Sequence, residues 1–409
     1  MEKMYEHQED FLAQRVDRTA LVWSCGTGKT RTACEWSKQD RGTALVICPK
    51  SLKKNWQRER KRWGANMIIM SKEEFKKQTM LGMVIKHSQV IVDEVHNGFL
   101  TPNFKSQMSK CLRDYIKKND IKRVLLLSAT VYTSSPWNIF TLATLLGYKW
   151  NWRDFNWKYF YQVRMGGRIV PMPKKGVEKE MAELTRKIAS VVDIHDCMDV
   201  PLQLHEDPQY FALTPEQERA IKSNYDPVHI VRYTKQHEIE NGILKGDTNG
   251  LIEDQTFPSD KIDRIDRLVR ENKKVAIVCR YNMQITALAQ HFEHAIPEKD
   301  VYIIQGATKN RDEITVQCEE AEEAIVIIQA DCAEGYQLPS FELCVFASMS
   351  YSFAKLEQVC GRFLRMDKPS RTTFSYLLSD GDSVDQAVYD AVKRKEDFQI
   401  ALYGKDDQQ

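Results

Sequence analysis

Several features that would place the chain in a special class are missing from its sequence. No stretch reaches 18 consecutive apolar residues, so no transmembrane helix is expected. The first residues, MEKMYEHQEDF, lack the apolar core of a signal peptide. The ten cysteines form no CxxC pair, which argues against a cysteine zinc site. Because several of them lie inside apolar runs, as buried free thiols do, we expect a reducing, cytoplasmic location and no secretion.

An excess of either charge is also missing. The 59 Lys and Arg residues balance 57 Asp and Glu residues, which leaves a net charge of +2. Any nucleic-acid site must therefore be a local patch. With 42% hydrophobic and 28% charged residues, the composition excludes a disordered or fibrous chain. A length of 409 residues predicts about two to four domains, and no internal repeat is visible.

Short apolar runs alternate with helical patterns in two parts of the chain. The runs that we predict as strands are 19–23, 43–49, 66–70, 89–95 and 123–130, then 274–279, 301–306, 324–330 and 342–348. Fully apolar strands with helices between them are typical of a parallel sheet covered on both faces. We therefore expect an α/β fold with a first lobe in 1–130, a helical extension and linker in 131–260, and a second lobe in 261–409.

A Gly-rich turn, SCGTGKT at 24–30, follows the first predicted strand and opens a helix. In a phosphate-binding loop the glycines turn backbone N–H groups towards phosphate, and the helix N-terminus adds positive potential. Lys29 would reach the β- and γ-phosphates, and Thr30 would bind Mg²⁺. Trp23 replaces the usual first glycine. The alternative is a Gly-rich turn with an incidental exposed lysine.

A second pattern, VIVDEVH at 90–96, ends an apolar strand in two carboxylates. Asp93 would hold Mg²⁺, and Glu94 would orient and deprotonate the attacking water. Alone, an acidic strand end is usually a solvated turn. Its position 64 residues after Lys29, on a later strand of the same sheet, favours the catalytic interpretation. His96 is a candidate contact between this site and neighbouring motifs, although a lone histidine is usually structural.

The third pattern is QVCGRFLR at 358–365 in the second lobe. Arg362 and Arg365 are three residues apart and would share one face of a helix. Two guanidinium groups on one face suit a polyphosphate, and an arginine from another lobe can stabilise charge during phosphoryl transfer. Alone, the pattern more often marks a solvated basic face.

Together these motifs resemble those of superfamily-two helicases, closest to the Swi/Snf-like branch. The segments that carry the resemblance are Tyr5–Gln8, Ser24–Thr30, Pro49–Leu52 with Asn55, Trp56 and Glu59, Ile69–Ser71, Asp93–His96, Ser128–Thr130, Thr214–Gln217, Ser259–Lys261, Ala333–Leu338 and Gln358–Arg365. The chain departs from the family where VYTSSPWN follows Ser128–Thr130, and where paired glycines are missing before Ala333.

The resemblance implies two RecA-like lobes with ATP and Mg²⁺ in the cleft between them. The implied catalytic residues are Lys29, Asp93, Glu94, Arg362 and Arg365. Those implied to bind nucleotide are Gln8, which would read adenine, with Gly26, Thr27, Gly28, Lys29, Thr30, His96, Gly335 and Gln358. Thr30 and Asp93 would bind the metal. Lys50, Ser51, Lys53 and Ser71 would contact nucleic acid.

The function implied by the resemblance is ATP-dependent movement along duplex or branched DNA, as in branch migration, fork remodelling, recombination or repair. The alternatives are an RNA-dependent ATPase or RNA helicase, and an ATP-gated nucleic-acid clamp with little turnover. The compact chain suggests a bacterial cell or a virus-infected host. No residue pattern indicates base-specific reading, a membrane partner or a particular protein partner.

Two further segments bear on nucleic-acid binding. Seven cations cluster around one acid, Glu59: Lys50, Lys53, Lys54, Arg58, Arg60, Lys61 and Arg62. They are either phosphate contacts or a solvated helix face. The aromatic segment 148–160 includes Trp150, Trp152 and Trp157, which would stack on bases or, more commonly, form core. The acidic run 319–323 is expected to face away from DNA.

Overall fold

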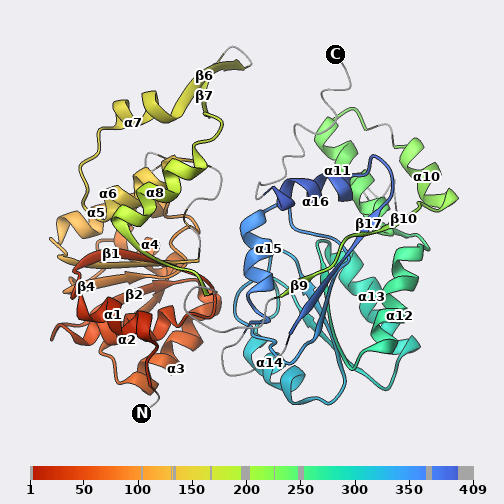
Figure 1. Ribbon diagram of the computed structural model, residues 1–409, viewed down its shortest axis with the longest axis horizontal. Coiled ribbons are helices and arrows are strands. Elements are labelled where there is room, and N and C mark those ends of the chain that lie inside the picture. The colour runs from red at the N-terminus through yellow and green to blue at the C-terminus, as the bar shows by residue number, and fades with distance from the viewer. Residues whose placement is uncertain are drawn as a thin grey trace. The chain divides into compact units, whose positions relative to one another are not determined.

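The computed structural model describes residues 3–102, 105–129, 131, 135–165, 168–194, 203–224, 226–246, 253–364 and 371–394, with no side chains described for 165–170. The chain divides into two compact units, Met1–Asp199 and Val200–Gln409, which are drawn together in Figure 1. No helix of the described residues is both long enough and apolar enough to cross a membrane.

The first unit is built on a six-stranded parallel sheet in the order β3-β2-β4-β5-β1-β8. The strands are β1 (Arg18–Trp23), β2 (Ala44–Cys48), β3 (Met67–Ser71), β4 (Gln89–Val92), β5 (Arg123–Ser128) and β8 (Ala189–Val192). Every residue of β2, β4 and β5 is buried, as the uninterrupted apolar runs predict for a sheet covered on both faces.

Helices cover both faces of this sheet because alternate side chains of each strand enter different cores. One core joins Ile47, Val92 and Leu126 to the helices that carry Phe75 and Leu112. The other joins Val46 and Leu127 to the helices of the opposite face. The helices that flank the first five strands are α1 (Glu6–Ala13), α2 (Lys29–Lys38), η1 (Lys50–Leu52), α3 (Lys53–Trp63), α4 (Lys72–Met80) and α5 (Gln107–Lys118).

The segment after β5 adds three helices, a hairpin and the last strand to the first unit. These elements are α6 (Trp137–Leu145), α7 (Trp152–Tyr159), β6 (Phe160–Met165), β7 (Arg168–Pro173) and α8 (Glu178–Ile188), followed by β8. β6 and β7 form an antiparallel hairpin that extends from the unit, as Figure 1 shows. Apolar side chains from α6 and α8 join the core that Phe75 helps to form.

The second unit has a parallel sheet in the order β10-β17-β16-β13-β15-β14, with β9 also paired to β17. Its strands are β9 (Leu204–His205), β10 (Gln209–Phe211), β13 (Lys274–Cys279), β14 (Asp300–Ile304), β15 (Ala324–Gln329), β16 (Leu343–Phe346) and β17 (Thr373–Ser379). The flanking helices are α12 (Asp260–Glu271), α13 (Asn282–Ala295), α14 (Arg311–Glu320), α15 (Phe353–Cys360) and α16 (Val384–Lys393). This sheet too has a separate apolar core on each face. The predicted α/β fold with two parallel-sheet lobes is confirmed.

The boundary between the units divides the segment 131–260, for which the sequence predicts a helical extension and linker. Residues 131–199 belong to the first unit because β8 pairs with β1. The remainder belongs to the second unit because β9 and β10 pair with β17. It contains α10 (Pro215–Lys222), α11 (His229–Glu240) and the short hairpin of β11 (Ile243–Leu244) and β12 (Gln255–Thr256). The segment is therefore not only helical, and each half is built into a sheet.

Candidate nucleotide-binding site

The Gly-rich turn lies between the end of β1 and the start of α2, as the sequence predicts. Gly26 and Gly28 have φ angles of 84° and 81°, which side chains other than glycine rarely adopt. Lys29 is the first residue of α2, and its Nζ donates to the carbonyls of Trp23 at 2.7 Å and Ser24 at 3.1 Å. The loop therefore presents a helix N-terminus and a lysine at one point, an arrangement suited to phosphate.

Two side chains of helix α1 form hydrogen bonds to the backbone of this loop. The Nε2 atom of Gln8 donates to the carbonyl of Gly28 at 3.0 Å, and its Oε1 accepts from the backbone N–H of Tyr5. His7 contacts the carbonyl of Thr27 through Nε2 at 2.9 Å. A Cβ atom on Gly28 would lie 2.2 Å from Gln8 Nε2, so any other residue there would displace the Gln8 amide in addition to straining the φ angle. Gln8, expected to read adenine, is fully buried as a support of the loop.

The strand β8 supports the same loop from the edge of the sheet. The backbone N–H of Ser24, the first loop residue, donates to the carbonyl of Val192 at 2.9 Å. The indole of Trp23 donates to the hydroxyl of Ser190 at 2.9 Å. Position 23, where the strict motif has glycine, thus holds a buried indole bonded to β8.

The two adjacent carboxylates lie just after β4, on the same edge of the sheet as the loop. Asp93 is 8% exposed, and its two oxygens accept from the indole N–H of Trp56 at 2.8 Å and from the backbone N–H of Glu94 at 3.0 Å. Burial, followed by the charge of Glu94, raises the pKa of Asp93 to about 7, against the lowering effects of Trp56 and Lys29. The Lys29 charge therefore acts on Asp93, as expected of partners in one site.

Glu94 has a φ angle of 49°, in the left-handed region that side chains seldom occupy. Such conformations are concentrated at functional sites. Its Oε2 is buried and accepts no hydrogen bond from the described residues, while His96 Nδ1 lies 3.4 Å away. His96 Nδ1 is also 2.8 Å from the hydroxyl of Ser128, at the end of β5. His96 therefore connects Glu94 to the predicted motif Ser128–Thr130, whose last residue, Thr130, lies outside the described residues.

The oxygen donors at this edge suit Mg²⁺, which prefers hard oxygen ligands and keeps several waters and phosphate oxygens. Thr30 follows Lys29 in the first turn of α2 and supplies a hydroxyl. Asp93 supplies a carboxylate whose oxygens are already oriented by Trp56 and Glu94. The Oε2 of Glu94, which accepts no hydrogen bond from the described residues, can accept one from a water molecule. The residues present therefore fit a metal held by few protein ligands.

In the second unit, the predicted motifs around Gly335 and Arg362 are bonded to each other. Gly335 has a φ angle of 83° in the loop after β15. Arg362 Nε donates to the carbonyl of Ala333 at 2.6 Å, and the Leu338 N–H donates to the Arg362 carbonyl at 2.9 Å. Gln358, expected to contact nucleotide, is 1% exposed on α15. Arg365 lies outside the described residues.

The predicted nucleic-acid contacts are divided between an exposed helix face and a buried cap. Lys50 and Ser51 are exposed in η1, whereas Lys53 pairs with Glu74 at 2.7 Å. Ser71 is 2% exposed, and its hydroxyl caps α4 by accepting from the Glu74 N–H. Ser71 thus has a capping role, because it ends β3 where α4 begins, and its expected contact with nucleic acid stays a prediction. The exposed cations of α3 that share one face are Lys54, Arg58 and Lys61.

The sequence identified Trp56 only as part of a motif, and the structure gives it a direct bond to Asp93. His7 and Ser190 were not identified as site residues. An indole and an imidazole inside amphipathic helices are ordinary core residues by pattern. Their bonds to the site arise only from folding.

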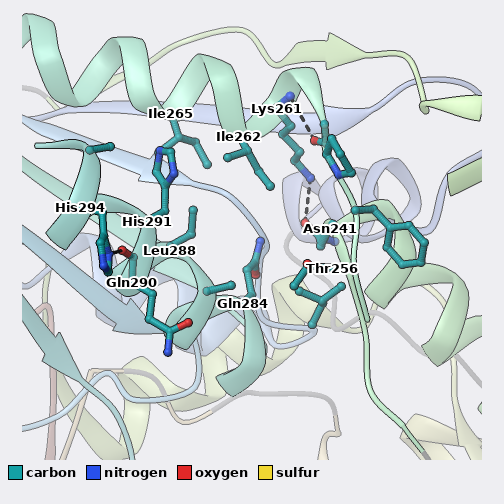
Figure 2. Close-up of a pocket in the computed structure, with 17 residues that line it drawn as sticks. Asn241, Thr256, Lys261, Ile262, Ile265, Gln284, Leu288, Gln290, His291 and His294 are labelled. Carbon is teal, nitrogen blue, oxygen red and sulfur yellow. Dashed lines mark hydrogen bonds between the residues drawn. The ribbon is translucent and has the colours of Figure 1, made fainter. Parts of the chain in front are cut away.

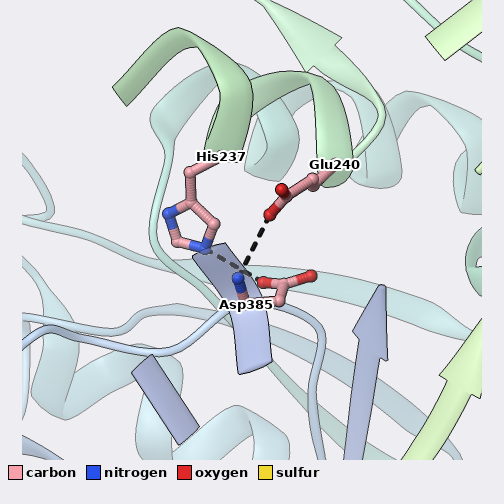
Figure 3. A group of neighbouring side chains, drawn as sticks. All are labelled: His237, Glu240 and Asp385. Atoms are coloured by element: carbon pink, nitrogen blue, oxygen red, sulfur yellow. Dashed lines mark hydrogen bonds and ion pairs between the residues drawn. The ribbon is translucent and has the colours of Figure 1, made fainter. Parts of the chain in front are cut away.

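A second buried cluster, shown in Figure 3, lies in the second unit and joins His237, Glu240 and Asp385. Asp385 accepts from His237 Nε2 at 2.9 Å and from Lys261 Nζ at 2.6 Å. Burial would raise the pKa of Asp385, but Lys261 and His237 hold it well below its usual value. Burial and the charge of Asp385 raise the pKa of Glu240 to about 8. Because the Lys261 ammonium already neutralises Asp385, the cluster is an ion-pair network rather than a metal centre.

A cavity of about 730 Å³ adjoins this network between α12, α13 and the β11–β12 hairpin, as Figure 2 shows. Its lining is mainly apolar, with Ile262, Ile265 and Leu288 prominent. Asn241 and Lys261 also line it, but they are bonded to each other at 2.8 Å. The side chains of Asn241 and Lys261 thus belong to the ion-pair network around Asp385.

Comparisons with known proteins bear mainly on the second unit. Residues 260–367 match the family model of the helicase conserved C-terminal domain. No curated protein matches the chain. Among solved structures, the chain is similar to the Sulfolobus solfataricus SWI2/SNF2 ATPase core in complex with dsDNA, at 16% identity and a TM-score of 0.42, covering 96% of this chain and 91% of that chain. The domain match agrees with the helicase resemblance that the sequence predicts, over residues 260–367.

Proposed function

We propose that this chain is a nucleic-acid-dependent ATPase of the Swi/Snf-like kind, which uses Mg²⁺ and hydrolyses ATP to move along duplex or branched DNA. The observation that carries the proposal is the arrangement at one edge of the first sheet. The loop that ends in Lys29 and the carboxylates Asp93 and Glu94 follow β1 and β4, which are separated only by β5. In parallel sheets, ligands bind at this carboxyl edge.

Each side chain at this edge has a role in phosphoryl transfer. Lys29 and the backbone N–H groups at the start of α2 bind phosphate oxygens. Glu94 orients the attacking water and takes its proton on Oε2. Thr30 and Asp93 hold Mg²⁺, which neutralises phosphate charge when it is bound. The resemblance adds Arg362, in the segment that matches the helicase C-terminal domain, as the residue that would stabilise the charge developing on the transferred group.

The basic face of α3 is the proposed contact for nucleic-acid phosphates. Lys54, Arg58 and Lys61 lie along it at spacings of four and three residues. Contacts of this kind bind without reading bases and weaken as salt rises. The finer assignment to DNA, and to branch migration or fork remodelling in a bacterial or virus-infected cell, is supported by the set of sequence motifs.

The test is steady-state ATP hydrolysis without polymer and then with single-stranded DNA, linear duplex, a four-way junction or RNA. We expect strong stimulation by duplex or junction DNA. Stimulation by RNA alone would replace the DNA motor with an RNA-dependent ATPase. ATP binding without hydrolysis on any polymer would contradict the proposed enzyme and favour a clamp.

Two variants with matched controls assign the activity to this site. Lys29→Ala should abolish tight ATP binding, whereas Lys38→Ala, at the exposed end of the same helix, should not. Glu94→Gln should retain ATP binding and lower hydrolysis by roughly 10²–10⁴-fold, the usual contribution of a general base. Glu73→Gln, on the surface of α4, is the control for the charge change. Full turnover in Glu94→Gln would refute its assigned role.

A further inference from the structure

The aromatic segment that follows α6 divides into a buried part and one exposed indole. Trp152 stacks on Trp137 with ring centroids 5.8 Å apart, and Trp150 stacks on Phe155 at 5.9 Å. These rings attach α7 to α6 and to the core of the first unit. Trp157, in contrast, is 84% exposed. Packing thus explains the other tryptophans of this segment but not Trp157.

The position of Trp157 follows from the faces of α7. Phe155 and Tyr159 are four residues apart and point into the core. Arg153 and Trp157, also four residues apart, share the exposed face. Lys174, just after β7, donates from Nζ to the Trp157 carbonyl at 3.1 Å, with Nζ 5.8 Å from the ring centroid. The exposed ring therefore has a cation on its own helix and another on the neighbouring strand end.

The surface around Trp157 is strongly basic in a chain that is nearly neutral. Residues 148–164 and 171–175 contain one acidic residue, Asp154, and the exposed cations Lys149, Arg153, Lys158, Arg164, Lys174 and Lys175. Lys158 pairs with Glu180 on α8 at 3.0 Å, and Arg164 lies towards the tip of the hairpin, opposite Ile169. The cations nearest to Trp157 are therefore Arg153 on the same face of α7 and Lys174 and Lys175 just after β7. A local excess of this size attracts a polyanion although the whole chain carries only +2.

We propose that the exposed face of α7 and the base of the β6–β7 hairpin bind nucleic acid, with Trp157 stacked on an unpaired base. The surrounding cations contact the phosphates on either side. An aromatic ring set among cations is the arrangement by which proteins hold single strands without reading sequence. The inference rests on the proposed function and adds a substrate class: polymers with an unpaired segment, such as tailed duplexes and open junctions.

Stacking requires an unpaired base because bases inside a duplex already stack on their neighbours. The basic face of α3 has no comparable exposed indole, since Trp56 is buried and Trp63 is partly buried beneath Arg31 at 4.3 Å. The two surfaces therefore differ in what they recognise. The α3 face suits the phosphate backbone of any strand, whereas Trp157 adds preference for single-stranded bases.

The test is equilibrium binding of labelled polymers to the full chain without ATP. The polymers are single-stranded DNA, blunt duplex, the same duplex with a single-stranded tail, and single-stranded RNA. Trp157→Ala should weaken binding to single-stranded and tailed polymers by roughly tenfold, the usual loss of one base–aromatic stack. Blunt-duplex binding should change less than about twofold, because it involves no free base. Trp157→Phe should restore most of the affinity.

Two controls and one spectroscopic measurement complete the design. Tyr210→Ala removes a ring that is 45% exposed in the second unit, and Lys117→Gln removes an exposed charge from α5. Neither should alter the preference for unpaired polymers. Single-stranded DNA should quench indole fluorescence in the wild type and quench it less in Trp157→Phe, because a stacked base quenches the ring.

Unchanged affinity of Trp157→Ala for every polymer would overturn the inference and leave the surface to a protein partner. Equal weakening for blunt and tailed duplex would also overturn it, since no unpaired base would be involved. A preference for RNA strands over DNA strands would show that the stacked base comes from RNA. The proposed stacking on Trp157 would still hold. If the wild type bound no polymer and hydrolysed no ATP, the proposed function would fail as well, so the two failures are distinguishable.

Discussion

The indole N–H of Trp56 donates to a carboxylate oxygen of Asp93 at 2.8 Å, and both side chains are buried. Trp56 belongs to α3, whose opposite face carries Lys54, Arg58 and Lys61. One helix thus has its basic face in solvent and its only buried residue on a carboxylate of the proposed metal site. A shift of α3 on binding phosphates would move this bond directly.

Trp56→Phe should lower polymer-stimulated ATP hydrolysis by about tenfold and change the rate without polymer less. The variant keeps an aromatic ring but removes the hydrogen bond that orients Asp93, a loss of about 1.5–3 kcal/mol for a charged acceptor. The ratio of stimulated to unstimulated turnover is the measurement. Trp36→Phe is a matched control, because Trp36 is equally buried and donates to the carbonyl of Val16. If both variants lost the same fraction of stimulated turnover, the effect of Trp56→Phe would be due to packing and not to the bond with Asp93.

The raised pKa of Asp93 predicts a pH dependence of stability in metal-free buffer. Its pKa is about 7 in the folded chain and 3.8 as a reference, so the folded state binds more protons between these values. Stability should therefore fall as pH rises from about 4 to about 7. Asp93→Asn should lose this component, so the wild type should lose more thermal stability than the variant between about pH 5 and pH 8. Parallel curves for the two proteins would contradict the prediction.

Gln8→Ala should raise the KM for ATP and for GTP by similar factors of several-fold. The reason is that Gln8 bonds to the Gly28 carbonyl and the Tyr5 N–H, so its loss loosens the phosphate loop for any nucleotide. Gln14→Ala, exposed at the end of the same helix, is the control. A selective loss for ATP would instead indicate that Gln8 reads the adenine base.

Arg362→Gln should retain ATP binding and lower hydrolysis by roughly 10³-fold or more, as expected of an arginine that stabilises transferred charge. Arg362→Lys should not rescue the rate, because a lysine lacks the planar fork of donors. Measurements of nucleotide affinity and of single-turnover hydrolysis separate an effect on ATP binding from an effect on the chemical step. Arg371→Gln removes an exposed charge from the same unit as a control. Retained turnover in Arg362→Gln would exclude it from catalysis.

Lys261→Met should destabilise the second unit by about 3–5 kcal/mol, because Asp385 would lose its cation while remaining buried. Lys273→Met breaks an ion pair whose side chains are 71% and 86% exposed, and should cost less than about 1 kcal/mol. Urea unfolding followed by a probe in the second unit measures the difference. Similar midpoints for the two variants would show that the buried network contributes little.

Much of the fold could be predicted from the apolar runs. The predicted strand 274–279 has the observed bounds of β13, and most of the others differ from the observed strands by one or two residues at an end. The prediction missed β8, because the side chains of this four-residue edge strand are partly buried or, at Val191, exposed and give a weak pattern. It also missed β17, because Thr373, Ser375 and Ser379 interrupt TFSYLLS and leave no continuous apolar run.

For the candidate site, the sequence predicts residues but not their bonds. Lys29, Asp93 and Glu94 could be predicted as site residues because phosphate and metal chemistry requires those residue types at strand ends. The partners that hold them could not: Trp56 and His7 have the spacing of ordinary core residues, and the contact of Ser24 with Val192 joins residues 168 positions apart. Such contacts depend on tertiary packing, which a local pattern does not encode.

The hydrogen bond from Ser24 to Val192 has a mechanical consequence. Val192, the last residue of β8, holds the first residue of the phosphate loop. Any displacement of β8 would therefore act on the loop at its anchor. Because β8 also pairs with β1, the strand that leads into the loop, the edge of the sheet and the shape of the phosphate loop would change together.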